Sequence, residues 1–238
     1  MDIGNVRRSI QFGFLIFIML SVNTFSQSSP PGTEKSPVEI QNEPRHHLKF
    51  ENKFVRIWDA LIPAGGATLW HIHSKDNVVL TLSDAHVRIE TVGAAPVETQ
   101  AKAGDVAFRK APYVHRTMSI GATPFHNIAI EILASHNSGN SSQTKAETGQ
   151  TAVIDNERVR VYKISIGPGE STGMQTLPAA SLQVALTPGR IETVKKDESK
   201  PVQKSISAGD LTWRENDVTR SIKNVGTTRF EAVDIELK

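Results

Sequence analysis

The stretch PAGGATLWHIHSKDN, residues 63–77, decides how the rest of this chain is interpreted. His71 and His73 stand two residues apart in a run rich in β-formers, and the period of two in a strand puts both imidazoles on one face. A third histidine, His115, follows a second strand-like run, AGDVAFRKAPYVH. Three converging imidazoles are a common ligand set for Zn, Fe, Ni or Cu. Paired histidines on a strand are also ordinary surface residues, so other parts of the chain must discriminate between the two interpretations.

The chain repeats itself at a nearly constant distance. ENKFVRIWDALIPAGGAT at 51–68 aligns with DNERVRVYKISIGPGEST at 155–172, a shift of 104 residues. AGDVAFR at 103–109 aligns with AGDLTWR at 208–214, a shift of 105. So long a period, with one residue of slippage, indicates two tandem domains of one fold rather than a solenoid.

The second copy serves as an internal control for the histidines. The candidate ligands are replaced together while the glycines and strand patterns persist: Gln175, Leu177, Ser181 and Arg220 stand where the first copy has His71, His73, Asn77 and His115. Independent drift of surface histidines gives no reason for this joint replacement. We therefore predict that the three histidines of the first copy face one interior metal site.

The pattern between these motifs predicts an all-β fold. From Leu48 onward no amphipathic helix of ten or more residues is evident, and short β-branched or alternating runs recur instead, among them FVRIWDALI, NVVLTL, HVRIETV and HNIAIEIL. Gly, Pro and Ser clusters separate them. This arrangement is typical of a sandwich or barrel.

The spacing of the first motif resembles the first cupin motif, a glycine, five residues, HxH and then usually a carboxylate. Gly65, His71 and His73 fit it, and Asn77 stands where the family commonly has glutamate. The resemblance implies Asn77 as a fourth, weak ligand through its amide oxygen. Without an anionic ligand we expect lower metal affinity, and Zn, Fe, Ni or Cu rather than Mn.

The second cupin motif is matched less fully. Gly104 and His115 fit it and Ser119 fits loosely, while Lys110 and Pro112 replace the usual Pro and Gly. The resemblance implies two tandem double-stranded β-helix (jelly-roll) barrels, a cupin domain with the metal site at 48–134 and a degenerate cupin domain at 150–238. It also implies dioxygenase, isomerase or lyase chemistry on a small oxygen-rich molecule. A non-catalytic binding or structural bicupin is the alternative.

The segments outside the two domains have other compositions. Residues 1–26 combine Arg7 and Arg8 with a short apolar run and a polar exit, the build of a signal peptide, so we expect an exported protein without a stable membrane span once the leader is removed. An uncleaved anchor and twin-arginine export are the alternatives. Residues 27–47 and 135–149 are rich in polar residues and are predicted to be a flexible spacer and a linker.

Composition excludes several classes of function. The net charge is +2 and the single dense Lys cluster, at 194–200, is diluted by acids, so nucleic acid is not an expected partner. The absence of cysteine excludes disulfides and a thiol nucleophile. The expected partner is a small-molecule ligand or substrate. Whether the barrels face each other within one chain or pair between chains in a homodimer stays open.

Overall fold

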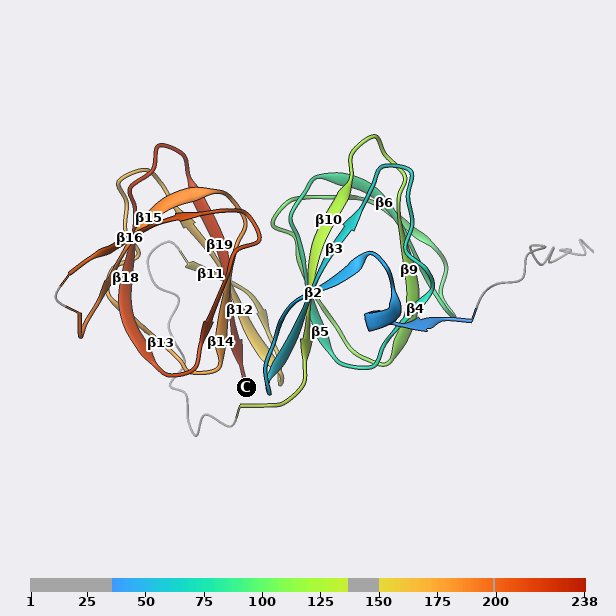
Figure 1. Cartoon of the computed structure of the whole chain (residues 1–238), viewed down its shortest axis with the longest axis horizontal. Coiled ribbons are helices and arrows are strands. Elements are labelled where there is room, and N and C mark those ends of the chain that lie inside the picture. Colours follow the sequence, from blue (N-terminus) through green and yellow to red (C-terminus); the bar gives the residue numbers. More distant parts are fainter. Residues whose placement is uncertain (1–35, 137–149, 199) are drawn as a thin grey trace, which may run out of the picture. The chain divides into compact units, whose positions relative to one another are not determined.

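The structure, a computed structural model, describes residues 36–136, 150–198 and 200–238, and it is built almost entirely of strands (Figure 1). The first half contains β1 (Val38–Glu39), η1 (Ile40–Asn42), β2 (His46–Glu51), β3 (Val55–Ile62), β4 (His71–His73), β5 (Asn77–Thr81), β6 (Ala85–Thr91), β7 (Val97–Ala101), β8 (Val106–Arg109), β9 (Tyr113–Ser119) and β10 (Phe125–Ile132). The second half contains β11 (Gln150–Asp155), β12 (Val159–Ile166), β13 (Gln175–Leu177), β14 (Ser181–Ala185), β15 (Gly189–Lys195), β16 (Val202–Ile206), β17 (Leu211–Arg214), β18 (Val218–Asn224) and β19 (Phe230–Leu237).

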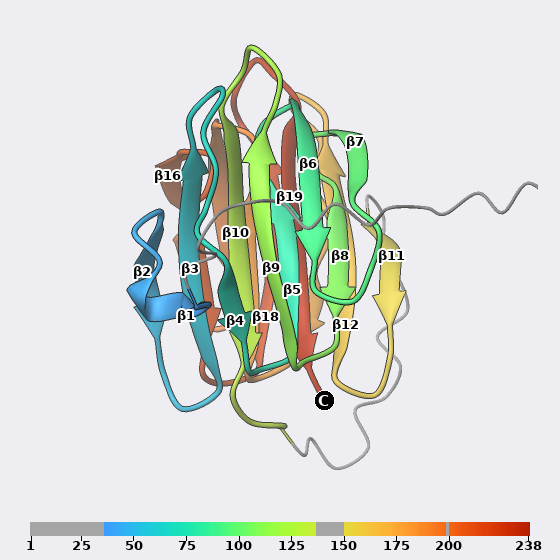
Figure 2. The same ribbon diagram turned by 90° about the vertical axis from the view of Figure 1, so that its right-hand side faces the viewer.

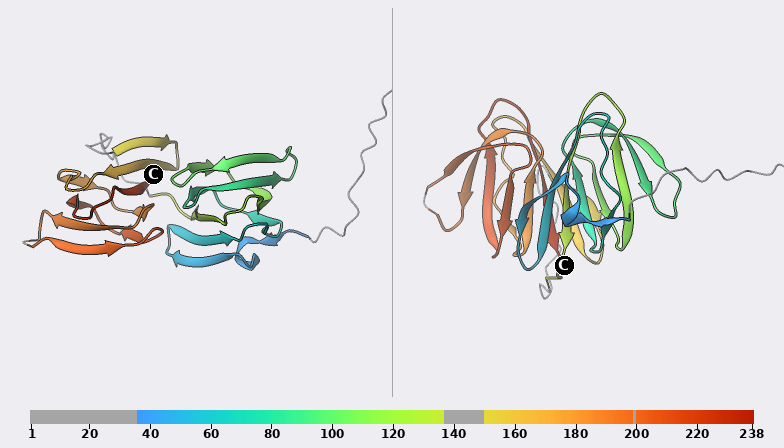
Figure 3. Two further views of the ribbon diagram at one scale, coloured as in Figure 1. Left: turned by 90° about the horizontal axis from the view of Figure 1, so that it is seen from above. Right: turned by 45° about the vertical axis from the view of Figure 1, so that its right-hand side comes forward.

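The strands of each half form two sheets of their own. The first half has the orders β1-β4-β9-β6-β7 and β2-β3-β10-β5-β8, and the second half has β13-β18-β15-β16 and β11-β12-β19-β14-β17. Figure 2 shows the strands of these sheets side by side, and seen from above the strands of the two halves do not interleave (Figure 3, left). The predicted all-β fold of two tandem jelly-roll barrels is confirmed.

The sequence repeat is reproduced in the backbone register. Phe125 on β10 lies opposite Ile62 on β3, and Phe230 on β19 lies opposite Ile166 on β12 in the same way. A β-bulge interrupts the β2–β3 pairing, and the β11–β12 pairing has a bulge at the equivalent place. The two copies therefore share hydrogen-bond registers as well as sequence patterns.

Repeated glycines have a conformational reason. Gly65 and its equivalent Gly169 have φ values of +71° and +78°, and Gly104 and Gly209 have +88° and +83°. Residues with a Cβ rarely adopt this left-handed region. These turns therefore retain glycine in both copies, including the copy that lacks the histidines.

The sheet that contains β3 and β10 is buried on both faces. Val55 and Ile57 belong to a hydrophobic cluster that also includes Val161 and Ile235 of the second half. Alternate residues on the opposite face pack inside the first barrel, where Ile62 belongs to the cluster of Val87 and Phe125. Burial on both faces explains why HNIAIEIL is a nearly continuous apolar run instead of a strict alternation.

The segment before Leu48 differs from the expected spacer. Residues 38–47 contribute β1, η1 and the start of β2, and β1 pairs in parallel with β4 through Val38 opposite His71. The second barrel has no described counterpart of β1. The predicted leader and most of the predicted linker lie outside the described residues. No helix within 36–136, 150–198 and 200–238 is long and apolar enough to cross a membrane.

Candidate metal centre

The antiparallel pairing of β4 with β9 brings the three histidines together. His71 lies directly opposite His115, and His73 lies opposite Tyr113, so all four side chains share the inner face. The ring centroids of the three histidines are 4.5 to 5.1 Å apart. One ring nitrogen from each lies within 4.8 Å of the other two, close enough to converge on a metal at the ~2.0–2.1 Å bond length of imidazole ligands.

The donor atoms of this cluster fit a metal. The Nδ1–H of His71 donates to the carbonyl oxygen of Leu69 at 2.9 Å, which leaves the lone pair on Nε2. That Nε2 is buried and has no hydrogen-bond partner among the described residues, and the same holds for both ring nitrogens of His115. Buried polar atoms are nearly always satisfied in folded proteins. A divalent cation would satisfy these lone pairs, and a hydrogen bond on the far ring nitrogen is typical of metal-binding histidines.

Burial keeps the cluster neutral. It lowers the pKa of His71 to about 4. It also lowers the pKa of His73 to about 2, and there the neighbouring His71 adds to the effect. The pKa of His115 falls well below its ordinary value for the same two reasons, burial first and then the other histidines. At neutral pH the three rings are therefore unprotonated, which coordination requires.

Asn77, at the position where the family has its carboxylate, is fully buried beside the cluster. Its amide exchanges hydrogen bonds with the Tyr113 hydroxyl, with Nδ2 at 2.9 Å and Oδ1 at 3.1 Å, and Nδ2 lies 3.5 Å from His73 Nδ1. The Tyr113 ring stacks on His73 at 4.7 Å. Asn77 and Tyr113 together thus support the ring of His73. The amide oxygen of Asn77, predicted as a weak ligand, accepts a hydrogen bond from the Tyr113 hydroxyl.

A second polar pair, Glu43 and His46, lies at this site and was not predicted from the sequence. His46 belongs to the segment predicted to be a flexible spacer, yet its side chain is only 6% exposed and its ring centroid lies 4.8 Å from that of His71. Its Nδ1–H donates to the buried Glu43 carboxylate at 2.6 Å. Burial opposes ionisation of Glu43, but the hydrogen bonds from His46 and from the backbone of Leu69 outweigh it and lower its pKa. No motif indicated this pair, because both residues precede the aligned segment, which begins at residue 51.

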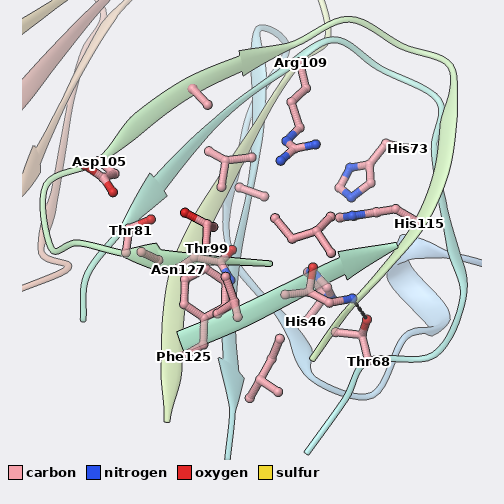
Figure 4. A pocket seen from close by; sticks show the side chains of 18 of the residues that line it. His46, Thr68, His73, Thr81, Thr99, Asp105, Arg109, His115, Phe125 and Asn127 are labelled. Carbon is pink, nitrogen blue, oxygen red and sulfur yellow. Dashed lines mark hydrogen bonds between the residues drawn. The ribbon is translucent and has the colours of Figure 1, made fainter. Parts of the chain in front are cut away.

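Arg109 is the second residue that the motifs did not single out. It lies opposite Asn77 on β8 and lines a cavity of about 210 Å³ together with the three histidines. Figure 4 shows Arg109, His73 and His115 pointing toward one another across this cavity. The positive charge of Arg109 contributes to the lowered pKa of His73 and of His115. Within the described part of the chain no carboxylate forms an ion pair with it.

Other histidine and acidic side chains of the first barrel have partners of their own. His126 forms a hydrogen bond of 2.6 Å with Asp59 outside the cluster, and Glu90 pairs with Arg116. Glu131 is buried, but it accepts a hydrogen bond from Trp58 at 3.0 Å and does not line the cavity. Burial raises the pKa of Glu131. His126, Glu90 and Glu131 are thus each engaged by partners other than the three histidines.

No protein-family model and no curated protein matches the sequence. Solved structures do match. The cupin 2 conserved barrel domain protein from Leptotrichia buccalis is 12% identical, with a TM-score of 0.51 over 81% of this chain and 88% of that one. This chain has the cupin fold. The salicylate 1,2-dioxygenase from Pseudaminobacter salicylatoxidans is 12% identical, with a TM-score of 0.53 over 77% of this chain and 71% of that one. A variant of the oxalate decarboxylase from Bacillus subtilis is 9% identical, with a TM-score of 0.56 over 81% of this chain and 75% of that one.

These identities establish the fold alone, and the predicted cupin fold is borne out. The neighbours include a dioxygenase and a decarboxylase, so this fold carries more than one chemistry. What this bicupin does must be argued from its own residues.

Proposed function

We propose that this bicupin binds a divalent transition metal through His71, His73 and His115 and acts with it on a small molecule that carries a carboxylate. The observation that carries the proposal is the position of Arg109, which faces the histidine cluster and has no carboxylate partner among the described residues. An arginine guanidinium matches a carboxylate in charge and in bidentate geometry.

The second barrel supplies the contrast. The equivalent arginine, Arg214, donates to Asp234 at 2.7 Å and to the Ser181 hydroxyl at 2.7 Å. In the first barrel the position equivalent to Asp234 is Ala129, a residue that lines the cavity. Arg109 is therefore left with its charge directed at the cavity, where an anionic ligand can neutralise it.

The cavity fits a small molecule with an apolar body. Its volume of about 210 Å³ exceeds the ~150 Å³ of an engineered cavity that accommodates benzene. Ile62, Val87 and Phe125 form apolar walls, and Arg109 and the histidines lie at one side. The neighbours named after salicylate and oxalate both act on carboxylates, which supports the same class of substrate here.

A metal held by three neutral imidazoles keeps its full charge and open positions, so when bound it can polarise an oxygen of the ligand. The protein supplies the rest. Arg109 holds the carboxylate, and the apolar walls exclude water from the body of the ligand. Burial, opposed by the hydrogen bond with Asn77, raises the pKa of Tyr113 to about 12, so its hydroxyl keeps its proton and can donate a hydrogen bond.

The test is metal analysis of untagged protein, followed by binding and oxygen-uptake measurements with salicylate and oxalate. We expect one metal per chain in the wild type and loss of the metal in His73→Leu. Arg109→Gln should retain the metal but bind the carboxylate ~10- to 100-fold more weakly. His126→Ala, which removes a histidine outside the cluster, is the matched control and should change neither. Metal retained in full by His73→Leu, or carboxylate binding indifferent to Arg109→Gln, would contradict the proposal.

A non-catalytic binding bicupin is the second candidate, and one observation favours it. Among the described residues, the one carboxylate that lines the cavity is Asp105, and it accepts a hydrogen bond from the backbone N–H of Lys102 at 2.8 Å. This part of the chain thus presents no unengaged carboxylate to the cavity as a general base. Metal and carboxylate binding without oxygen uptake or product formation would select this candidate.

A further inference from the structure

The second barrel contains a buried cation at the place of the metal ligand. Gln175 lies opposite Arg220 in the β13–β18 pairing, as His71 lies opposite His115 in the first barrel. The side chain of Arg220 occupies the interior and is only 7% exposed. A positive side chain thus stands in place of a neutral ligand at the centre of an otherwise equivalent barrel.

Arg220 lacks the partners that a buried guanidinium normally has. Its side-chain hydrogen bond from Nη2 to Gln183 Oε1 is long, 3.3 Å, and its buried Nε has no partner among the described residues. The nearby carboxylate of Asp234 is already bound by Arg214 at 2.7 Å. Burial, together with the charge of Arg214, lowers the pKa of Arg220 to about 10, which still leaves it protonated at neutral pH. Burying an uncompensated charge is costly, so an anion is expected in its vicinity.

A cavity of about 260 Å³ adjoins this arginine. Gln183, Lys195 and Lys204 line it together with Arg220, and the lining acids are Glu198 and Asp210. Glu198 pairs with Lys195 at 2.5 Å, and Asp210 accepts a hydrogen bond from the backbone N–H of Ser207 at 2.9 Å. The buried Nε2 of Gln183 is a second donor for which the described residues offer no partner.

We propose that the second barrel is a metal-independent binding site for a small carboxylate anion, held by Arg220 with Gln183 and Lys204. Its distinguishing feature is that the guanidinium takes the place of the metal as the positive centre. The proposal does not depend on the function proposed for the first barrel, because no residue is shared between the two cavities.

The experiment isolates this site in the full chain. Metal is removed by chelation and dialysis, and Arg109→Gln serves as the background so that the first barrel offers no cation to the probe. Malonate is titrated by calorimetry and by thermal unfolding, with sodium chloride at equal ionic strength as reference. We expect one malonate per chain and a Tm that rises with malonate concentration.

Variants then locate the site. Arg220→Gln in this background should weaken malonate binding ~10- to 100-fold, and Lys204→Gln, at an exposed position, should weaken it less. Arg229→Gln removes one charge outside the cavity and should leave binding unchanged. Absence of malonate binding in the Arg109→Gln background would overturn the proposal, and so would equal binding by Arg220→Gln and Arg229→Gln. If Arg220→Gln does not fold, Lys204→Gln decides, and unchanged binding in that variant overturns the proposal.

Discussion

The two barrels share strand registers, bulges and glycine turns, but their interiors differ in charge. Among the described residues, the first barrel places His71, His73 and His115 around its cavity together with Arg109, which has no ion pair. At the positions of His115 and Arg109 the second barrel has Arg220 and Arg214, and Arg214 pairs with Asp234. The shared features lie in the backbone and the differences lie in side chains on inner faces. The comparison teaches that this framework forms without the histidines, so their presence in the first copy is not explained by the fold.

The largest effect should come from transferring a residue of the second barrel into the first. His73→Leu reproduces Leu177 and removes one of three ligands, so metal affinity should fall at least ~100-fold, to the point where purified protein contains none. Thermal unfolding of the metal-free forms should be little changed, because the second barrel buries leucine at this position. Metal analysis of wild type, His73→Leu and His126→Ala provides the measurement. Equal metal content in all three would remove the basis of the comparison.

Acid should act on the first barrel selectively, because residues 150–238 contain no histidine. In the metal-free chain the pKa values of His71 and His73 are about 4 and about 2, below the ~6.5 of an unfolded histidine. The unfolded state therefore binds more protons below pH ~6.5, and the free energy of unfolding falls as the pH drops toward 4, by up to ~1.4 kcal/mol per pH unit for each histidine.

Urea unfolding between neutral pH and about pH 5 measures this slope. The variant His71→Gln carries the residue of the second copy. Its free energy of unfolding should depend less steeply on pH, by the contribution of about one proton. An unchanged slope in that variant would show that the histidines do not govern the acid sensitivity.

The charge pair of the second barrel should matter more for stability than any pair at the surface. Asp234 and Arg214 are 2% and 4% exposed at their side chains, and Asp234→Ala leaves the buried Arg214 without its carboxylate. We expect a loss of ~3–5 kcal/mol in the free energy of unfolding. Asp155→Ala, which breaks the pairs of the half-exposed Asp155 with Arg160 and Lys238, is the control and should cost little. Similar losses in both variants would argue against a special role for the interior pair.

The converse substitution places the second barrel's carboxylate in the first. Ala129→Asp should pair with Arg109 as Asp234 pairs with Arg214, and carboxylate binding should fall ~10- to 100-fold while the metal stays bound. Calorimetry with salicylate and parallel metal analysis measure the two effects. If salicylate binds Ala129→Asp as tightly as wild type, Arg109 is not the anchor.

The smallest effect is expected at the family's carboxylate position. Asn77→Glu adds an anionic donor beside His73 and should tighten metal binding ~10-fold, partly offset by the loss of the Asn77 hydrogen bonds with Tyr113. Ser181→Glu makes the equivalent change in the second barrel and should create no metal site. Competition with a chelator gives both affinities. Weaker binding in Asn77→Glu would indicate that the metal lies out of reach of this position.

The sequence by itself determined the all-β class, the tandem repeat and the joint presence of His71, His73 and His115 in one copy. These features are local patterns, since strand periodicity and the spacing of glycines and histidines are visible along the chain. A sequence signal for Arg109 also existed. Both copies keep this arginine, but only the second places a carboxylate at the aligned position, Asp234 against Ala129.

Only the tertiary structure decided which of these residues meet. Glu43 and His46 precede the aligned repeat, and only the fold brings the ring of His46 within 4.8 Å of the ring of His71. Arg220 is a buried cation, and the carboxylate of Asp234 is paired with Arg214 instead of with it. Neither its burial nor this pairing can be predicted from the order of residues. The physical reason is that partner choice and desolvation depend on which faces of distant strands are apposed, whereas propensity and period depend on near neighbours.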